Sequence, residues 1–89
     1  MLKVSVISPE RVLFDGDAQS VVAPAFDGEV GVLSGHAPML TLLGSGELRL
    51  TTDAGISRFT VEGGFLQVVD DAVRVVTERA TAQEQEIER

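Results

Sequence analysis

The sequence predicts an all-β domain, a flattened antiparallel β-sandwich of about eight to ten short strands. Apolar and polar residues alternate with a period of two along most of the chain, which is typical of strands with one buried face. Turn-forming residues recur about every 8–12 residues, as they do in sandwiches and barrels. The 89 residues suit one domain, and four Phe with no Trp or Tyr leave the core to aliphatic side chains.

Four short strands are expected in the first half of the chain. They are residues 2–6, 11–14, 19–23 and 29–33. In the first of them Leu2, Val4 and Val6 share one face. Turns are expected at Pro9-Glu10, Asp15-Gly16-Asp17 and Phe26-Asp27-Gly28, and Pro24 is expected to end the third strand.

Two hairpins are expected in the second half. Residues 47–51 and 56–62 flank a turn at 53–55, and residues 65–69 and 73–77 flank Asp70-Asp71. Gly63-Gly64 separates the hairpins as a break or a bulge. The side chains expected inside are Val4, Val6, Leu48, Leu50, Phe59, Val61, Phe65, Val73 and Val75.

The composition changes near residue 78, which divides the chain into a sandwich domain at residues 1–78 and a polar tail at residues 79–89. From Glu78 to Arg89 there are four Glu and two Arg, and Ile87 is the only large apolar residue. These residue types favour helix, but a short helix with so little to bury is marginal by itself. We therefore expect a short, frayed helical tail.

Composition excludes several classes of function. Without Cys the chain has no disulfide, thiolate metal site or cysteine nucleophile. A net charge of −7 without a basic stripe disfavours binding to nucleic acid or to anionic lipid. No apolar run approaches the 18 or so residues of a membrane span, and the N-terminus alternates like a strand, unlike a signal peptide. No Lys-Ser or Lys-Thr follows the glycines, so we expect no phosphate loop.

Few side chains could perform chemistry. The single His36 could serve as a general base toward Ser34 or Thr41, but no carboxylate stands beside it in the sequence. A loop or contact histidine is the plainer interpretation. Asp27 and Glu29 share one face of an extended chain, yet they also suit the two sides of a turn. We predict a protein that is not an enzyme, with no catalytic, cofactor-binding or metal-binding residues.

The segment Pro38–Leu43 is apolar, contains Met39 and follows a glycine-containing loop. It is either a core strand or, in part, an exposed docking edge, because methionine and aliphatic side chains adapt well to partner surfaces. The residues by themselves thus indicate a β-sandwich that binds a partner.

Residues 27–40 read Asp-Gly-Glu-Val-Gly-Val-Leu-Ser-Gly-His-Ala-Pro-Met-Leu. They closely resemble the Gly-Glu-x-Gly-x-x-x-Gly-His-Ala-Pro signature of the epsilon subunit family of F-type ATP synthases, called delta in mitochondria. Further family segments follow in order: Ser8-Pro9-Glu10 with Phe14-Asp15-Gly16, Gly46 with Leu48 and Leu50, Glu62 to Val68, and Val73 to Thr77. The resemblance covers residues 1–78, is of the bacterial or plastid type, and concerns the N-terminal β-sandwich domain.

The resemblance implies a non-catalytic subunit of the central stalk, the rotor, that links the gamma subunit to the c-ring and couples proton flow to ATP synthesis. The catalytic head would be an indirect partner. The membrane would be reached only through the complex, on the cytoplasmic side of a bacterial inner membrane rather than in a plastid thylakoid. The family presents to the c-ring and gamma the positions that match Glu29, Ser34, Gly35, His36, Ala37, Pro38, Met39 and Leu40.

Two other functions stay open. The family usually continues into a C-terminal helical hairpin that inhibits ATP hydrolysis and, in some members, binds ATP; residues 80–89 resemble only its beginning. A regulatory subunit is therefore the second interpretation, and a stand-alone ligand-binding β-module is the third. Ser34, where the family often has Pro, is a smaller departure.

We expect this chain not to bind ATP, since it has neither a basic phosphate cradle nor the full hairpin. Titration calorimetry with ATP at micromolar concentrations should show no saturable heat. Saturable binding in that range would refute the expectation.

Overall fold

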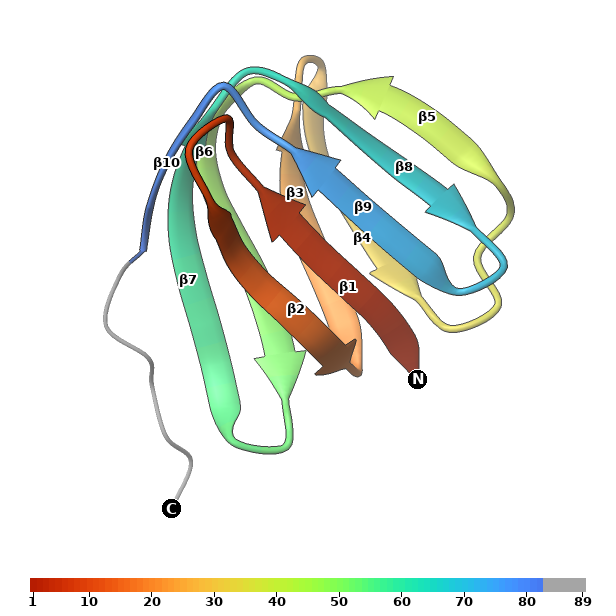
Figure 1. The fold of residues 1–89 in the computed structure, drawn as a ribbon. Helices are drawn as coiled ribbons and strands as arrows, with labels where there is room; N and C mark the ends of the chain where they lie inside the picture. Colours follow the sequence, from red (N-terminus) through yellow and green to blue (C-terminus); the bar gives the residue numbers. More distant parts are fainter. Residues whose placement is uncertain (83–89) are drawn as a thin grey trace.

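The computed structural model describes residues 1–82 as two five-stranded sheets packed face to face (Figure 1). The strands are β1 Leu2–Ile7, β2 Val12–Ala18, β3 Ser20–Ala25, β4 Gly28–Leu33, β5 Met39–Leu42, β6 Ser45–Thr52, β7 Gly55–Glu62, β8 Phe65–Val69, β9 Ala72–Val76 and β10 Arg79–Ala82. Sheet A has the order β2-β1-β9-β8-β5, and sheet B has the order β10-β7-β6-β3-β4. The expected all-β sandwich is confirmed. Within residues 1–82 no helix is long and apolar enough to cross a membrane.

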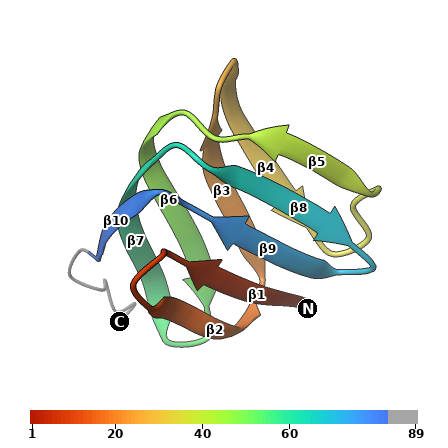
Figure 2. The same ribbon diagram turned by 45° about the horizontal axis from the view of Figure 1, so that its top comes forward.

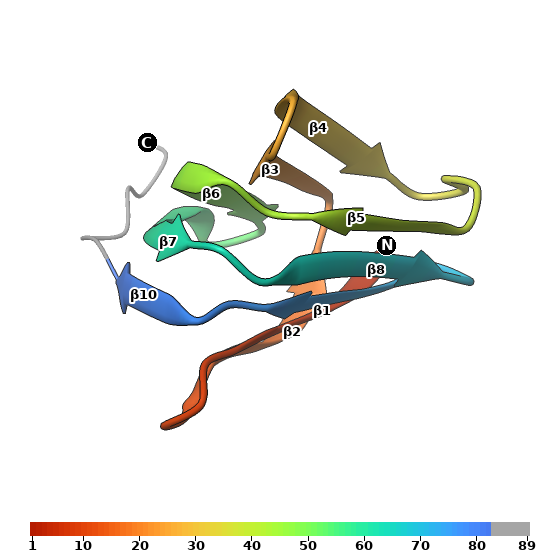
Figure 3. The ribbon, with the colours of Figure 1, turned by 90° about the horizontal axis from the view of Figure 1, so that it is seen from above.

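The core lies between the two sheets and is almost entirely aliphatic (Figure 3). Successive residues of a strand point to opposite faces, so each strand gives one row of side chains to this layer. Phe59 of β7 is the one buried aromatic residue among those described, at 5% exposure. Eight of the expected interior residues are confirmed as buried: Val4, Val6, Leu48, Leu50, Phe59, Val61, Val73 and Val75.

The expectation that Phe65 lies inside is wrong. On β8 the buried side chains are Leu66 and Val68, so the alternation places Phe65 on the outward face, where it is half-buried. Gly63 and Gly64, at φ of 66° and 100°, lie where the chain passes from β7 in sheet B to β8 in sheet A. A β-carbon at Gly64 would overlap the backbone of the neighbouring β9, so only glycine fits there.

The expectation of a turn at Asp15-Gly16-Asp17 is also wrong. These residues lie within β2 and pair with β1, with Gly16 opposite Val4. The reversal occurs earlier, where the amide of Ser8 donates to the Arg11 carbonyl over 2.9 Å. Gly16 takes an inward position that a larger residue would usually fill, and the ring of Phe14 lies over it. The alternation is therefore intact although the composition is typical of a turn.

Pro24 does not end β3, which continues to Ala25. The Pro24 carbonyl accepts a hydrogen bond of 2.8 Å from the amide of Gly44. The N–H and C=O groups of a strand residue point to the same side, so the missing N–H of Pro24 faces away from β4 and removes no bond to that strand.

Two pairings differ from the predicted architecture. β1 pairs with β9 in parallel, so sheet A is not wholly antiparallel. At the other end of the chain, residues 79–82 form β10 rather than the start of a helix. The free edge of β7 supplies their backbone partners, and Ala80 packs on the core opposite Val61 while Arg79 faces Glu62. The rest of the predicted tail, residues 83–89, lies outside the described residues.

Replacing Phe59 with Ala should destabilise the domain by about 3–5 kcal/mol, because the ring fills the space between the sheets. That is a large part of the roughly 5–15 kcal/mol that holds a domain together. Phe26→Ala is the matched control: Phe26 is 67% exposed, and surface changes usually stay within about 0.5 kcal/mol. Urea denaturation of both variants measures the difference, and equal effects would contradict the position of Phe59 in the core.

Candidate functional site

One side of the sandwich contains every residue of the predicted partner site. β4 is an edge strand of sheet B, β5 is an edge strand of sheet A, and both lie on the same side of the molecule (Figures 1 and 3). A loop of residues 34–38 joins them. We call residues 26–42 the β4–β5 side. It holds Glu29, Ser34, Gly35, His36, Ala37, Pro38, Met39 and Leu40.

The β4–β5 side is unusually apolar for a solvent-facing surface. Seven large hydrophobic side chains are exposed in the described residues, and four of them belong to this side. They are Phe26, Leu33, Leu40 and Leu42. Exposed apolar groups gathered in one region are typical of surfaces that bind another protein. Of these four, only Leu40 was among the predicted site residues.

β5 resolves the two interpretations of the apolar segment after the loop. Met39 is half-buried against the core, and Leu43, just after the strand, is buried. Leu40 and Leu42 point outward and are 70% and 63% exposed. The segment therefore contributes one row of side chains to the core and one row to the exposed edge.

Glu29 is part of an ion-pair network on the outer face of sheet B. Its carboxylate lies 3.7 Å from the guanidinium of Arg49 on β6. Arg49 in turn lies 3.8 Å from Glu47, which also holds Arg58 of β7 at 2.9 Å. Glu29 itself remains 63% exposed, so the pair with Arg49 contributes little stability and leaves the carboxylate accessible to a partner.

Glu29 and the loop lie at opposite ends of β4. Ser34 is five positions after Glu29, which is roughly 16 Å along a strand. The predicted site is therefore an extended side with two polar ends, a carboxylate at one and the His36 loop at the other. Leu33, next to the loop on β4, and Leu40, near the start of β5, are exposed apolar residues of this side.

The β4–β5 loop is held by Asp71, a residue of the turn between β8 and β9 (Figures 1 and 2). The hydroxyl of Ser34 donates to Asp71 Oδ2 over 2.8 Å, and the amide of Gly35 donates to Asp71 Oδ1 over 2.7 Å. Gly35 has a φ of 87°, which glycine adopts without strain. Sequence reasoning identified Asp71 only as a turn residue, because its partners are 36 and 37 positions away.

His36 is arranged as a contact residue. Its amide donates to the Leu33 carbonyl over 3.1 Å, and its ring Nδ1 lies 2.6 Å from the Ala37 carbonyl. A carbonyl oxygen only accepts, so Nδ1 carries the proton and Nε2 remains available. The Ser34 hydroxyl is bound to Asp71 and not to His36. The loop therefore contains no nucleophile–base pair.

The hydrogen bonds at the loop lower the pKa of the Asp71 carboxyl below its ordinary value. The amide of Gly35 is the largest cause, the Ser34 hydroxyl is the next, and the positive amino terminus adds to both. Partial desolvation opposes them. Because the charged carboxylate accepts both bonds, the loop is held most firmly when Asp71 is ionised.

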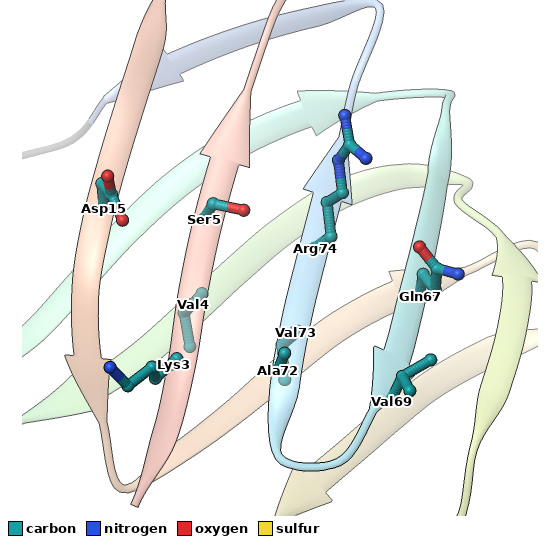
Figure 4. A pocket seen from close by; sticks show the side chains of 9 residues that line it. All are labelled: Lys3, Val4, Ser5, Asp15, Gln67, Val69, Ala72, Val73 and Arg74. Carbon is teal, nitrogen blue, oxygen red and sulfur yellow. The ribbon is translucent and has the colours of Figure 1, made fainter.

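A shallow depression on the outer face of sheet A is the main alternative site. It has a volume of about 490 Å³, and its polar lining includes Lys3, Ser5, Asp15, Gln67 and Arg74 (Figure 4). These side chains come from β1, β2, β8 and β9, and Figure 4 shows that they do not converge on one point. No group of three or more metal-ligating side chains is found within residues 1–82. The geometry thus favours a protein-binding side over a small-molecule site.

Comparison with known proteins agrees with this geometry. The family described as ATP synthase, Delta/Epsilon chain, beta-sandwich domain matches residues 1–83. The chain belongs to this family.

Bacterial relatives named ATP synthase epsilon chain extend the match. The protein of Rhodopirellula baltica is 51% identical over 79 residues, which are 89% of this chain and 62% of the relative. That of Leptospira borgpetersenii is 40% identical over 83 residues, 93% of this chain and 65% of the relative. The chain thus spans about two thirds of the length of these relatives. A Chlorobium limicola relative, 38% identical over 77 residues, is covered over 88% of its length.

Two solved structures share the fold. One, titled as the OSCP/F1/c-ring part of the Euglena gracilis mitochondrial ATP synthase, aligns with a TM-score of 0.84 at 21% identity and covers 91% of this chain and 52% of that one. The other, titled as the central stalk/c-ring of the Tetrahymena thermophila enzyme, has a TM-score of 0.77 at 15% identity and covers 90% and 65%. At these identities the two structures support the family's sandwich fold.

Acidification should release the β4–β5 loop from Asp71. The folded pKa of Asp71 is lowered, so the stabilisation by its two bonds is present above the unfolded pKa and is lost as the pH falls through the folded pKa, below about pH 4. In an NMR titration the Gly35 amide proton should shift together with the Asp71 carboxyl carbon. Asp71→Asn should abolish that transition. A Gly35 amide proton that does not shift as Asp71 titrates would contradict the hydrogen bond between them.

Proposed function

We propose that this chain is a non-catalytic subunit of the central stalk of an F-type ATP synthase, joining the gamma subunit to the c-ring and coupling proton flow to ATP synthesis. The observation that carries the proposal is the exposed, largely apolar β4–β5 side on the sandwich of an epsilon-family chain. The names of the relatives and the titles of the two solved structures support the same assembly.

The β4–β5 side has the composition of a protein interface. Leu33, Leu40 and Leu42 offer apolar area, which supplies most of the affinity of such contacts. Glu29 and His36 at its two ends offer a carboxylate and a ring nitrogen, which orient a partner more than they bind it. A partner with basic loops would complement Glu29 and the net charge of −7.

The proposal includes a location. The relatives reported above come from bacteria, which supports a peripheral place for this chain in the complex, at the cytoplasmic side of a bacterial inner membrane. The chain itself would touch the membrane only through its partners. Its acidic character agrees with this arrangement, since anionic lipid would repel it.

A regulatory role is the second candidate, and one observation bears on it. About a third of the length of the Rhodopirellula and Leptospira relatives lies outside the match to this chain. The Chlorobium relative carries the same name although this chain covers 88% of it, so a protein of that name contains little beyond the sandwich. Coupling through the sandwich is therefore the function that residues 1–82 support best.

Replacing the two polar ends of the β4–β5 side should impair coupling without unfolding the protein. We expect the double variant Glu29→Gln with His36→Ala to bind a complex of gamma and the c-ring about fivefold or more weakly. A loss of this size is usual when important interface residues are truncated. Proton-driven ATP synthesis by a reconstituted synthase should fall with it. Thermal melting should change little, because Glu29 is exposed and the half-buried His36 lies in a loop outside the core.

Glu10→Gln is the matched control for these variants. Glu10 is an exposed carboxylate in the β1–β2 turn, outside the β4–β5 side. It should leave binding and synthesis unchanged. If the Glu29 and His36 variants fold, bind and couple as well as the Glu10 variant does, the β4–β5 side is not the partner site.

A further inference from the structure

We propose that Asp71 is a positioning residue, which holds the Ser34-Gly35 turn so that His36, Ala37 and Pro38 meet the partner in one fixed conformation. The inference rests on the proposed function, because it concerns the same partner site. Asp71 itself lies on another hairpin, outside the β4–β5 side. It would act through the loop and not by touching the partner.

The contacts of Asp71 form a short chain from the loop to β1, an inner strand of sheet A. Its two carboxylate oxygens accept one bond each, from the Ser34 hydroxyl and the Gly35 amide. Its backbone carbonyl accepts a 2.8 Å bond from the amide of Lys3, near the start of β1. The loop is thereby connected to a strand that is paired on both sides.

The loop has little else to fix it. In the described part of the chain, the other hydrogen bonds of residues 34–38 are local, from the His36 amide to Leu33 and between the His36 ring and Ala37. Ser34, Gly35, Ala37 and Pro38 are all exposed. Without Asp71 this segment would have only these local hydrogen bonds and its two flanking strands to restrict it.

The carboxylate of Asp71 stands on a backbone conformation that is unfavourable for most residues. Asp70 and Asp71 both adopt positive φ, at 49° and 62°, where hairpin turns prefer Asn and Gly. Asn would suit the backbone at least as well, but its amide can accept on one oxygen only. A carboxylate can accept from Ser34 and Gly35 together, which explains an aspartate at position 71 by its contacts and not by the turn.

The variants Asp71→Asn and Asp70→Asn separate the contact of Asp71 with the loop from the loss of a charge in the turn. Both remove one negative charge from the same turn, and both keep a residue that tolerates positive φ. Only Asp71→Asn removes an acceptor of the loop. Ser34→Ala removes one of the two donors and should give an intermediate result.

The first measurement is amide hydrogen exchange of Gly35 in the full 89-residue chain. Asp71→Asn should accelerate exchange at Gly35, whereas Asp70→Asn should leave it near that of the unaltered chain. This readout does not involve a partner. Equal exchange at Gly35 in the two variants would overturn the positioning role, whatever becomes of the proposed function.

The second measurement is the affinity for the complex of gamma and the c-ring. Asp71→Asn should weaken binding by roughly two- to tenfold, because the partner must then order the loop itself. Asp70→Asn should bind as the unaltered chain does, and both variants should stay folded at the temperature of the assay. If His36→Ala weakens binding but Asp71→Asn does not, the positioning role is wrong while the partner site stands. If neither His36→Ala nor Asp71→Asn weakens binding, both are wrong.

Discussion

The aliphatic layer between the two sheets is the constraint on which the rest of the molecule depends. With Phe59 as the one buried aromatic ring in residues 1–82, the layer is made of Val, Leu and Ala side chains, and each strand must present its apolar row to it in strict alternation. That requirement sets the register of every pairing and, with it, which residues face outward. The outward row of β5, Leu40 and Leu42, follows from the inward position of Met39 and Leu43. The partner side is thus a consequence of how the core is filled.

The alternation allowed most of the fold to be predicted, and it failed where a glycine took a strand position. Gly16 sits inside β2 between two aspartates, a composition that favours turns, and only the pairing with β1 shows that it is extended. Phe65 was placed on the wrong face, although it shares its side of β8 with Gln67 and alternates with the buried Leu66 and Val68. The parallel pairing of β1 with β9 is equally invisible locally, since it joins residues about 70 positions apart.

The candidate site was likewise predicted only in part from the sequence. The loop around His36 was found through its resemblance to a family motif, and the exposed edge through its apolar residues. The contacts that shape it were not found. Arg49 reaches Glu29 only after sheet B has formed, and Asp71 reaches the loop only after the two sheets have come together. The exposure of Phe26 and Leu33 likewise depends on β4 being an edge strand, which topology decides and composition does not.

The parallel pairing of β1 has a consequence for how the chain folds during synthesis. β1 is made first, yet one of its two neighbours in sheet A, β9, ends only at Val76. A ribosome-bound chain therefore exposes β1 with one open edge until nearly the whole sandwich has emerged. Pairings between distant parts of a chain form slowly, because the loop between them must close first. The domain is expected to fold late and as one unit, and ribosome-bound chains that end before β9 should be good substrates for chaperones.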